Sequence, residues 1–109
     1  MNVETQFVNY ICEQLSDAGK ITYRKMFGSY GVYMDGKFIA LICDDQLFLK
    51  PTSVGRTILQ TPTEEAPFPG AKDWFLIEDL ENSELLTRLL IASWGELPYQ
   101  KQKKPKKTK

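Results

Sequence analysis

The pattern of apolar residues at the start of the chain predicts an amphipathic helix over residues 3–18. Apolar side chains recur there at spacings of three and four, as they do on one face of a helix. They are Val3, Phe7, Ile11, Leu15 and Ala18, with Val8 and Cys12 beside them. Gly19 follows directly, and a glycine just past a helix end is typical of a left-handed backbone at that position. We therefore expect a helix that packs one face against the next part of the chain.

The next thirty residues predict an antiparallel meander. Apolar segments alternate with short turn sequences and indicate strands over residues 21–27, 30–34, 37–43 and 46–50. Asp35-Gly36 is the strongest turn signal, because both residues tolerate the positive φ of a type I′ turn. Asp44-Asp45 is a weaker turn of the same length. Four strands joined in this way form a sheet of neighbouring antiparallel pairs.

The two turns also divide the predicted sheet into two faces, because they place Met34 opposite Lys37 and Cys43 opposite Gln46. One face is wholly apolar and is expected to meet the helices. It comprises Tyr33, Phe38, Ala40, Ile42, Leu47 and Leu49. The other comprises Tyr30, Val32, Ile39, Leu41 and Phe48, fringed by Lys37, Gln46 and Lys50. This second face is too apolar for full exposure to water, so we expect another segment or a partner to cover it.

The remaining elements complete an α+β fold, an antiparallel meander with flanking N- and C-terminal helices. We expect a short helix over residues 53–60, a loop over the proline-rich residues 61–70, a strand over residues 73–78 and a final helix from Asn82 or Ser83 to about Trp94. The inner side of that helix carries Leu86, Leu89, Leu90, Trp94 and Leu97. We predict one domain over residues 1–100 and a disordered lysine-rich tail over residues 101–109.

The net charge of zero over 109 residues hides a split between this tail and the rest of the chain. The tail carries six of the 14 basic residues, which leaves eight basic and 14 acidic residues, a charge of −6, in the rest. Its lysines are Lys101, Lys103, Lys104, Lys106, Lys107 and Lys109. Six such cations predict weak, non-specific nucleic-acid binding with a logarithmic salt slope of about −5. A solubilising end without a partner is the other interpretation.

Few residues offer catalytic, metal or redox chemistry. The chain has no histidine, which removes the commonest general base and metal ligand. Its two cysteines, Cys12 and Cys43, sit in apolar patterns and indicate packing positions. The spacing of Gly28 and Gly31 matches no phosphate-binding loop, and a bend in the sheet explains these glycines better. We therefore predict no enzyme activity, no cofactor and no metal.

No apolar stretch approaches the length of a membrane span, and the first residues lack a signal-peptide pattern. A cytoplasmic protein without membrane contact is the prediction.

Several different short motifs follow one another along the chain, and most of them contain a glycine or an aromatic residue. In order they are Arg24-Lys25-Met26-Phe27-Gly28, Gly31-Val32-Tyr33, Asp35-Gly36, Leu47-Phe48-Leu49-Lys50, Pro67-Phe68-Pro69-Gly70-Ala71-Lys72 before Trp74-Phe75, and Trp94 shortly before Leu97-Pro98. This series, over residues 5–100, resembles the TfoX/Sxy N-terminal domain, a family named for regulators of DNA-uptake competence. The lysine-rich ending is similar to that of the short, stand-alone members.

The resemblance implies an antiparallel sheet with flanking helices, similar to the secretion-chaperone-like architecture. It also implies a regulatory domain that acts by protein contacts, with the transcription machinery as an expected partner, and it brings no catalytic residues. In members called competence regulators a helical C-terminal domain follows, whereas this sequence ends at Lys109. Arg24, Lys50 and Lys72 match motif positions, and we consider two interpretations for them: a surface patch for a partner or an anion, and local ion pairs.

Three further possibilities stay open at this point. The apolar second face predicts a homodimer in which two copies cover each other. A small ligand-binding domain or enzyme would use a pocket between helix and sheet with convergent polar side chains. A nucleic-acid module would stack bases on Tyr30 and Phe48, but it needs more basic neighbours than Lys37 and Lys50.

Overall fold

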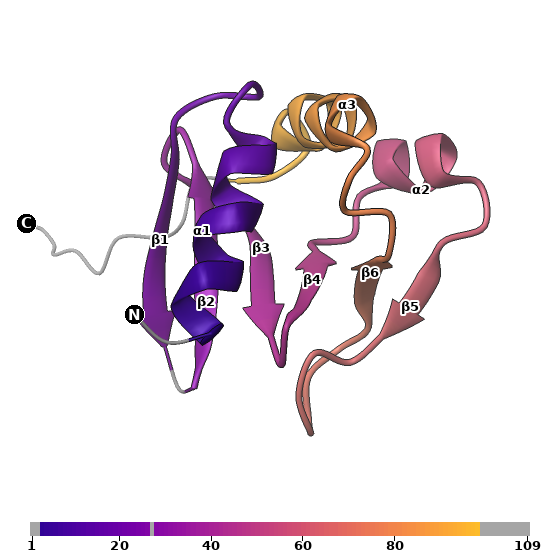
Figure 1. The fold of residues 1–109 in the computed structure, drawn as a ribbon. Helices are drawn as coiled ribbons and strands as arrows, with labels where there is room; N and C mark the ends of the chain where they lie inside the picture. The colour runs from indigo at the N-terminus through magenta and orange to yellow at the C-terminus, as the bar shows by residue number, and fades with distance from the viewer. Residues whose placement is uncertain (1–2, 27, 99–109) are drawn as a thin grey trace, which may run out of the picture.

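A computed structural model describes residues 3–26 and 28–98. This part of the chain folds into three helices and one six-stranded antiparallel sheet (Figure 1). The elements are α1 (Val3–Leu15), β1 (Ile21–Met26), β2 (Ser29–Met34), β3 (Lys37–Cys43), β4 (Gln46–Leu49), α2 (Ser53–Leu59), β5 (Thr63–Glu65), β6 (Trp74–Ile77) and α3 (Ser83–Trp94). The predicted α+β class with N- and C-terminal helices is confirmed. The predicted tail, residues 101–109, lies outside the described residues.

Helix α1 buries the predicted stripe but ends earlier than expected. Val8, Ile11 and Leu15 are fully buried. The helix stops at Leu15, and the left-handed backbone expected at Gly19 is wrong, because positive φ among the described glycines occurs at Gly28, Gly36 and Gly70. A Cβ on Gly19 would lie 2.5 Å from Oδ2 of Asp35. Gly19 therefore allows the chain after α1 to approach the β2–β3 turn closely.

Both predicted two-residue turns are present, with positive φ at each central residue. These residues are Asp35 (46°), Gly36 (87°), Asp44 (50°) and Asp45 (59°). The register follows as predicted, because Met34 lies opposite Lys37 and Cys43 opposite Gln46. The full strand order is β1-β2-β3-β4-β6-β5, so β1 and β5 form the two edges.

The proline-rich segment 61–70 contains a strand that the sequence did not predict. Residues Thr63–Glu65 form β5 and pair antiparallel with β6. The guanidinium of Arg56, on α2, forms an ion pair with the carboxylate of Glu64. This contact ties the edge strand to the helix that precedes it, which local turn preferences alone do not reveal.

The predicted assignment of side chains to the two faces is partly wrong, because a β-bulge interrupts the pairing of β2 and β3. Val32 lies opposite Ala40 and Tyr33 opposite Phe38, so Ile39 is an extra residue. One extra residue reverses which side chains point to which face. Tyr33 and Phe38 therefore lie on the face of the sheet opposite the helices, and not on the helix side as predicted.

The residues that take their place on the helix side include three that were expected on the other face. Tyr30, Val32 and Ile39 belong to the main apolar cluster, which combines residues of all three helices with one face of the sheet. Lys37, predicted to fringe the second face, is buried beside Trp94 on the helix side as well. The main core therefore lies between the sheet and the helices.

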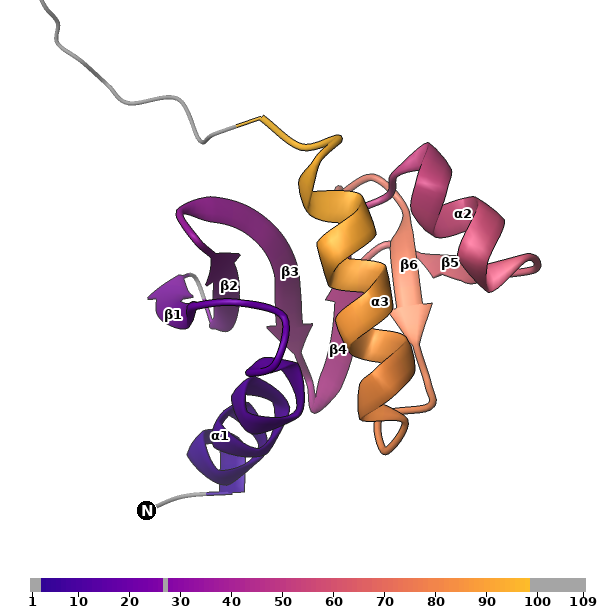
Figure 2. The ribbon, with the colours of Figure 1, turned by 90° about the horizontal axis from the view of Figure 1, so that it is seen from above.

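Helix α3 lies between α1 and α2 when the molecule is viewed from above (Figure 2). Its predicted inner side is confirmed, because Leu86, Leu89 and Leu90 are buried and Trp94 is partly buried; Leu97, just beyond the end of the helix, is buried as well. Asn82 caps the helix, since its side chain accepts a hydrogen bond from the backbone N–H of Leu85 at 3.1 Å. The three helices therefore cover one face of the sheet.

Candidate functional site

The opposite face of the sheet carries a second apolar cluster made of strand residues alone. We call it the helix-free face. It comprises the buried residues Leu41, Cys43 and Phe48 and the partly buried residues Met26, Phe38, Trp74 and Leu76. No helix contributes to it in residues 3–26 and 28–98. The sequence predicted such an apolar second face, and Leu41 and Phe48 are on it as expected.

A groove of about 460 Å³ opens on the helix-free face. It is lined by Met26, Ser29, Phe38, Leu41, Phe68 and Trp74. Ser29 is the polar member of this lining, and its hydroxyl oxygen accepts a hydrogen bond from the Cys43 thiol, 2.9 Å away. Phe68 comes from the β5–β6 connection and is 49% exposed. An apolar groove bordered by a half-exposed aromatic ring is typical of a contact site.

Gly31 permits the close packing of the groove wall. A Cβ on Gly31 would lie 2.6 Å from Cε of Met26 and 3.2 Å from Cε1 of Phe38. These separations are shorter than ordinary van der Waals contacts, so any other residue would push the two side chains apart. Gly31 thereby lets Met26 and Phe38 meet across β2.

Three aromatic rings form a continuous row on this side of the sheet. The ring centroids of Tyr33 and Phe38 are 5.3 Å apart, and those of Phe38 and Trp74 are 5.7 Å apart. Both separations fall in the favourable range for aromatic pairs. The row links β2, β3 and β6, and its second and third rings line the groove.

Two cations lie over this aromatic row. The guanidinium carbon of Arg24 is 5.6 Å from the Tyr33 ring centroid, and Nζ of Lys50 is 4.9 Å from the Phe38 ring centroid. Cations at these distances are attracted to the ring faces. Burial lowers the pKa of the Lys50 ammonium, because charge is less well solvated there.

The structure thus brings two of the three predicted patch residues, Arg24 and Lys50, to one face. Each of them contacts an aromatic ring there, Tyr33 for Arg24 and Phe38 for Lys50. Among the described side chains, none of Arg24, Lys50 and Lys72 forms an ion pair with a carboxylate. Lys72 is exposed, and no described contact joins it to the other two. Whether these residues act as a patch for a partner stays a prediction.

The possibility that nucleic-acid bases stack on Tyr30 and Phe48 is wrong. Tyr30 is on the helix side of the sheet and 8% exposed, so it packs in the main core. Phe48 is on the helix-free face but only 2% exposed. Neither ring is accessible to a base, which weakens the case for the sheet as a nucleic-acid platform.

The two cysteines occupy packing positions, as predicted. Cys12 packs against the main core and Cys43 belongs to the helix-free face, and both are free thiols. Burial raises the pKa of the Cys12 thiol, which disfavours a reactive thiolate. The clusters that hold them lie on opposite sides of the sheet, so the structure does not bring the two sulfurs together.

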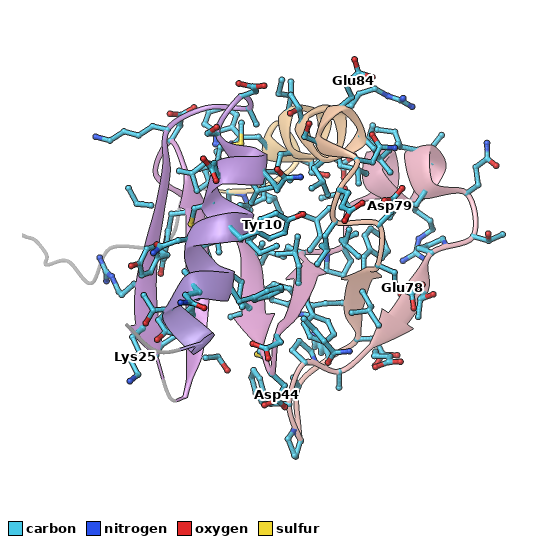
Figure 3. The ribbon with its side chains drawn as sticks, in the orientation of Figure 1. Tyr10, Lys25, Asp44, Glu78, Asp79 and Glu84 are labelled. Carbon is cyan, nitrogen blue, oxygen red and sulfur yellow. The ribbon has the colours of Figure 1, made fainter. Side chains whose placement is uncertain are left out.

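Charged side chains are distributed unevenly around the described molecule. Lys25 lies at the β1 edge, whereas Glu78 and Asp79 lie toward the opposite end of the sheet, beside β6 (Figure 3). The two edge strands beside the groove also carry opposite charges. Arg24 is on β1, and Glu65 is on β5, where it lies opposite the groove residue Trp74. A partner that spans the helix-free face therefore meets the Arg24 guanidinium at β1 and the Glu65 carboxylate at β5.

A second cavity corresponds to the predicted alternative of a pocket between helix and sheet. It lies between Leu59 and Leu85 of the helices and Ile77 of β6, with Glu78 and Asp79 at its border. Its volume is about 190 Å³. Pockets for small ligands usually span roughly 300–1,000 Å³. This cavity therefore gives the ligand-binding alternative little support.

Two further features concern metals and membranes. Over the described ranges, no three acidic or cysteine side chains come together as a group that could hold a metal ion. Within the same ranges, each helix is too short or too polar to cross a bilayer.

A sequence model of the TfoX N-terminal domain matches residues 13–97, a span that includes the whole groove. The chain belongs to the TfoX N-terminal domain family. It is also 31% identical over 107 residues to the "Uncharacterized 12.7 kDa protein in trpE 5'region" of Spirochaeta aurantia, a match that covers 97% of this chain and 93% of that protein. The resemblance noted from the motifs is confirmed. The TfoX N-terminal domain family is one of competence-related regulatory domains.

None of the six residues that line the groove was predicted as a site residue from the sequence. Phe68 and Trp74 belonged to the family motifs, but they were assigned only to a loop and to an apolar strand. The available signal was the position of Phe68, a large apolar residue between two prolines in a segment without other large apolar side chains. Such a residue is exposed unless a partner or another segment covers it.

Proposed function

We propose that this TfoX N-terminal domain is a non-enzymatic cytoplasmic regulator of competence that acts through protein contacts at the groove of the helix-free face. The observation that carries the proposal is the groove itself, an apolar space of about 460 Å³ lined in part by Phe68, which is 49% exposed. Burial of such a surface against another protein supplies favourable free energy, since apolar area leaves water. Membership of the TfoX N-terminal domain family supports the link to competence.

The test of this proposal is genetic. Cells that carry this gene would be compared with a deletion strain and with the deletion strain supplied with the wild-type gene. The readout is the frequency of transformation by added DNA. We expect the deletion to change transformation and the wild-type gene to restore it. Equal transformation in all three strains would contradict a role in competence.

We further propose that the lysine tail adds weak, non-specific affinity for nucleic acid. The charges support this, because the tail contributes six lysines while residues 1–100 carry a net charge of −6. Fluorescence anisotropy with DNA across a salt series would compare the full chain with a version that ends at Gln100. We expect binding by the full chain alone, with a logarithmic salt slope of about −5. Equal binding by both would place the nucleic-acid surface in the folded domain and contradict this role for the tail.

A further inference from the structure

We propose that the groove binds an aromatic side chain flanked by carboxylates, presented by an acidic segment of a protein partner. This inference rests on the proposed function, because it names the chemistry of the partner that the helix-free face contacts. It follows from three observations: the aromatic walls of the groove, the half-exposed Phe68 among its lining residues, and the Lys50 ammonium over the Phe38 ring.

The walls favour an aromatic occupant. The rings of Phe38 and Trp74 face the same space with their centroids 5.7 Å apart, at an angle of 57° between their planes. A ring inserted beside them makes edge and offset contacts of the kind that stabilise aromatic clusters. The half-exposed ring of Phe68 supplies a third contact and loses its exposure to water when the groove is filled.

The charge beside the groove favours a carboxylate. Lys50 lies over Phe38, a wall of the groove, and forms no ion pair among the described side chains. Arg24 lies one ring further along the row, over Tyr33, and likewise forms no ion pair there. A partly buried cation without a carboxylate gains interaction energy when a partner supplies one.

Negative charge on the β5 side of the groove determines how the partner is oriented. Glu65 on β5 is exposed and lies opposite Trp74, on the far side of the groove from Arg24. A carboxylate placed there would meet like charge, whereas one beside Lys50 meets opposite charge. The partner's acidic residue therefore lies on the side of β1 to β4, with the aromatic ring in the groove.

Three short peptides test this chemistry on the full-length protein. The probes are acetyl-Glu-Trp-Glu-amide, acetyl-Gln-Trp-Gln-amide and acetyl-Glu-Ala-Glu-amide, followed by shifts of backbone amide signals in nitrogen-15 NMR spectra. We expect the first to bind about fivefold more tightly than the second, as for a partly exposed ion pair. The third, which lacks the ring, should bind at least about tenfold more weakly than the first. Signals of Leu41 and Phe68 should move most.

Variants test whether Lys50 binds the carboxylates of the peptide and whether Phe68 binds its aromatic ring. Lys50→Met keeps the apolar stem and should abolish the difference between the first two peptides, while Lys25→Met, an exposed lysine on β1, should preserve it. Phe68→Ser should weaken both tryptophan peptides. The spectrum of each unbound variant shows whether it is folded.

Several results would overturn the inference. One is equal binding of the acidic and neutral peptides, and another is an unchanged preference in Lys50→Met. A third is a doubled mass in light scattering together with peptide-insensitive groove signals, which would show that a second copy fills the groove. If the peptides fail while the deletion still changes transformation, the chemistry proposed here is wrong and the regulatory function stands. If the peptides bind but the deletion has no effect on transformation, the regulatory function fails instead.

Discussion

The ammonium of Lys37 lies 3.7 Å from the centroid of the Trp94 ring and donates a hydrogen bond to the Trp94 carbonyl oxygen at 2.9 Å. The indole N–H of Trp94 in turn donates to the carbonyl oxygen of Met34 at 2.7 Å. Lys37 is only 7% exposed. These contacts fasten the β2–β3 hairpin to the end of α3, and they explain how a lysine is accommodated on the helix side of the sheet.

Replacement of this lysine is expected to destabilise the domain. Lys37→Met removes the ring contact and leaves the Trp94 carbonyl without this donor, so we expect the free energy of unfolding to fall by about 1–3 kcal/mol. Urea denaturation followed by tryptophan fluorescence measures the loss. Lys25→Met, which removes an exposed lysine, should change it by less than about 0.5 kcal/mol. Equal effects of the two substitutions would contradict a stabilising role for Lys37.

The contact between α2 and α3 depends on Gly55. A Cβ there would lie 2.7 Å from Oγ1 of Thr52, which caps α2 by accepting a hydrogen bond from the Gly55 N–H at 2.9 Å. It would also lie 3.2 Å from Phe75 and 3.3 Å from the hydroxyl of the fully buried Ser93. The glycine is therefore needed for close packing, although it weakens the helix itself.

Gly55→Ala should consequently destabilise the domain in spite of the better helix propensity of alanine. We expect a net loss of about 1–2 kcal/mol in the free energy of unfolding, since overpacking outweighs propensity. Gly95→Ala is the matched control. Gly95 has φ of −65° and the nearest heavy atom to an added Cβ is 3.9 Å away, so alanine fits there. A stabilising Gly55→Ala substitution would show that the contact relaxes freely.

Glu96 connects the end of α3 to the start of α2. Its carboxylate accepts hydrogen bonds from the backbone N–H of Ser53 at 2.9 Å and of Val54 at 2.8 Å, and another from the Ser53 hydroxyl at 2.9 Å. The backbone bonds to Ser53 and Val54 hold the pKa of Glu96 below its ordinary value of 4.5. The charged carboxylate therefore favours the folded state.

A specific pH dependence follows from that lowered pKa. The contribution of Glu96 to stability is fully present above pH 4.5 and is lost as the pH falls through the lower pKa of the folded state. Wild type should exceed Glu96→Gln in free energy of unfolding at pH 7, and the difference should shrink in acid. Urea denaturation at a series of pH values measures both proteins. A difference that is independent of pH would contradict the assigned role.

Local sequence signals predicted most of the secondary structure of this TfoX N-terminal domain. Asp35-Gly36 and Asp44-Asp45 are turn residues whose backbone preferences act without tertiary help, so the strands and the register next to each turn followed directly. The bulge at Ile39 was not predictable in this way. It lies within an uninterrupted apolar segment, and no polar residue marks the change of face.

The groove was predictable only in part. Alternation along the strands indicated a second apolar face, and the family motifs drew attention to Arg24 and Lys50. The pairing of these cations with Tyr33 and Phe38 depends on the bulge, which moves both rings to the helix-free face. The position of Phe68 over the groove depends on how the β5–β6 connection packs, and a proline-rich segment carries no such information.

The most direct test of the central claim compares two exposed apolar residues on different surfaces of the domain. Phe68 borders the groove and is 49% exposed, whereas Ile91 lies on α3 and is 55% exposed. The deletion strain would receive genes that encode Phe68→Ser or Ile91→Ser, and immunoblots would confirm equal amounts of protein. The transformation frequency of each strain is then measured. We predict that Ile91→Ser restores the wild-type frequency and Phe68→Ser does not, whereas full restoration by both would contradict regulation through the groove.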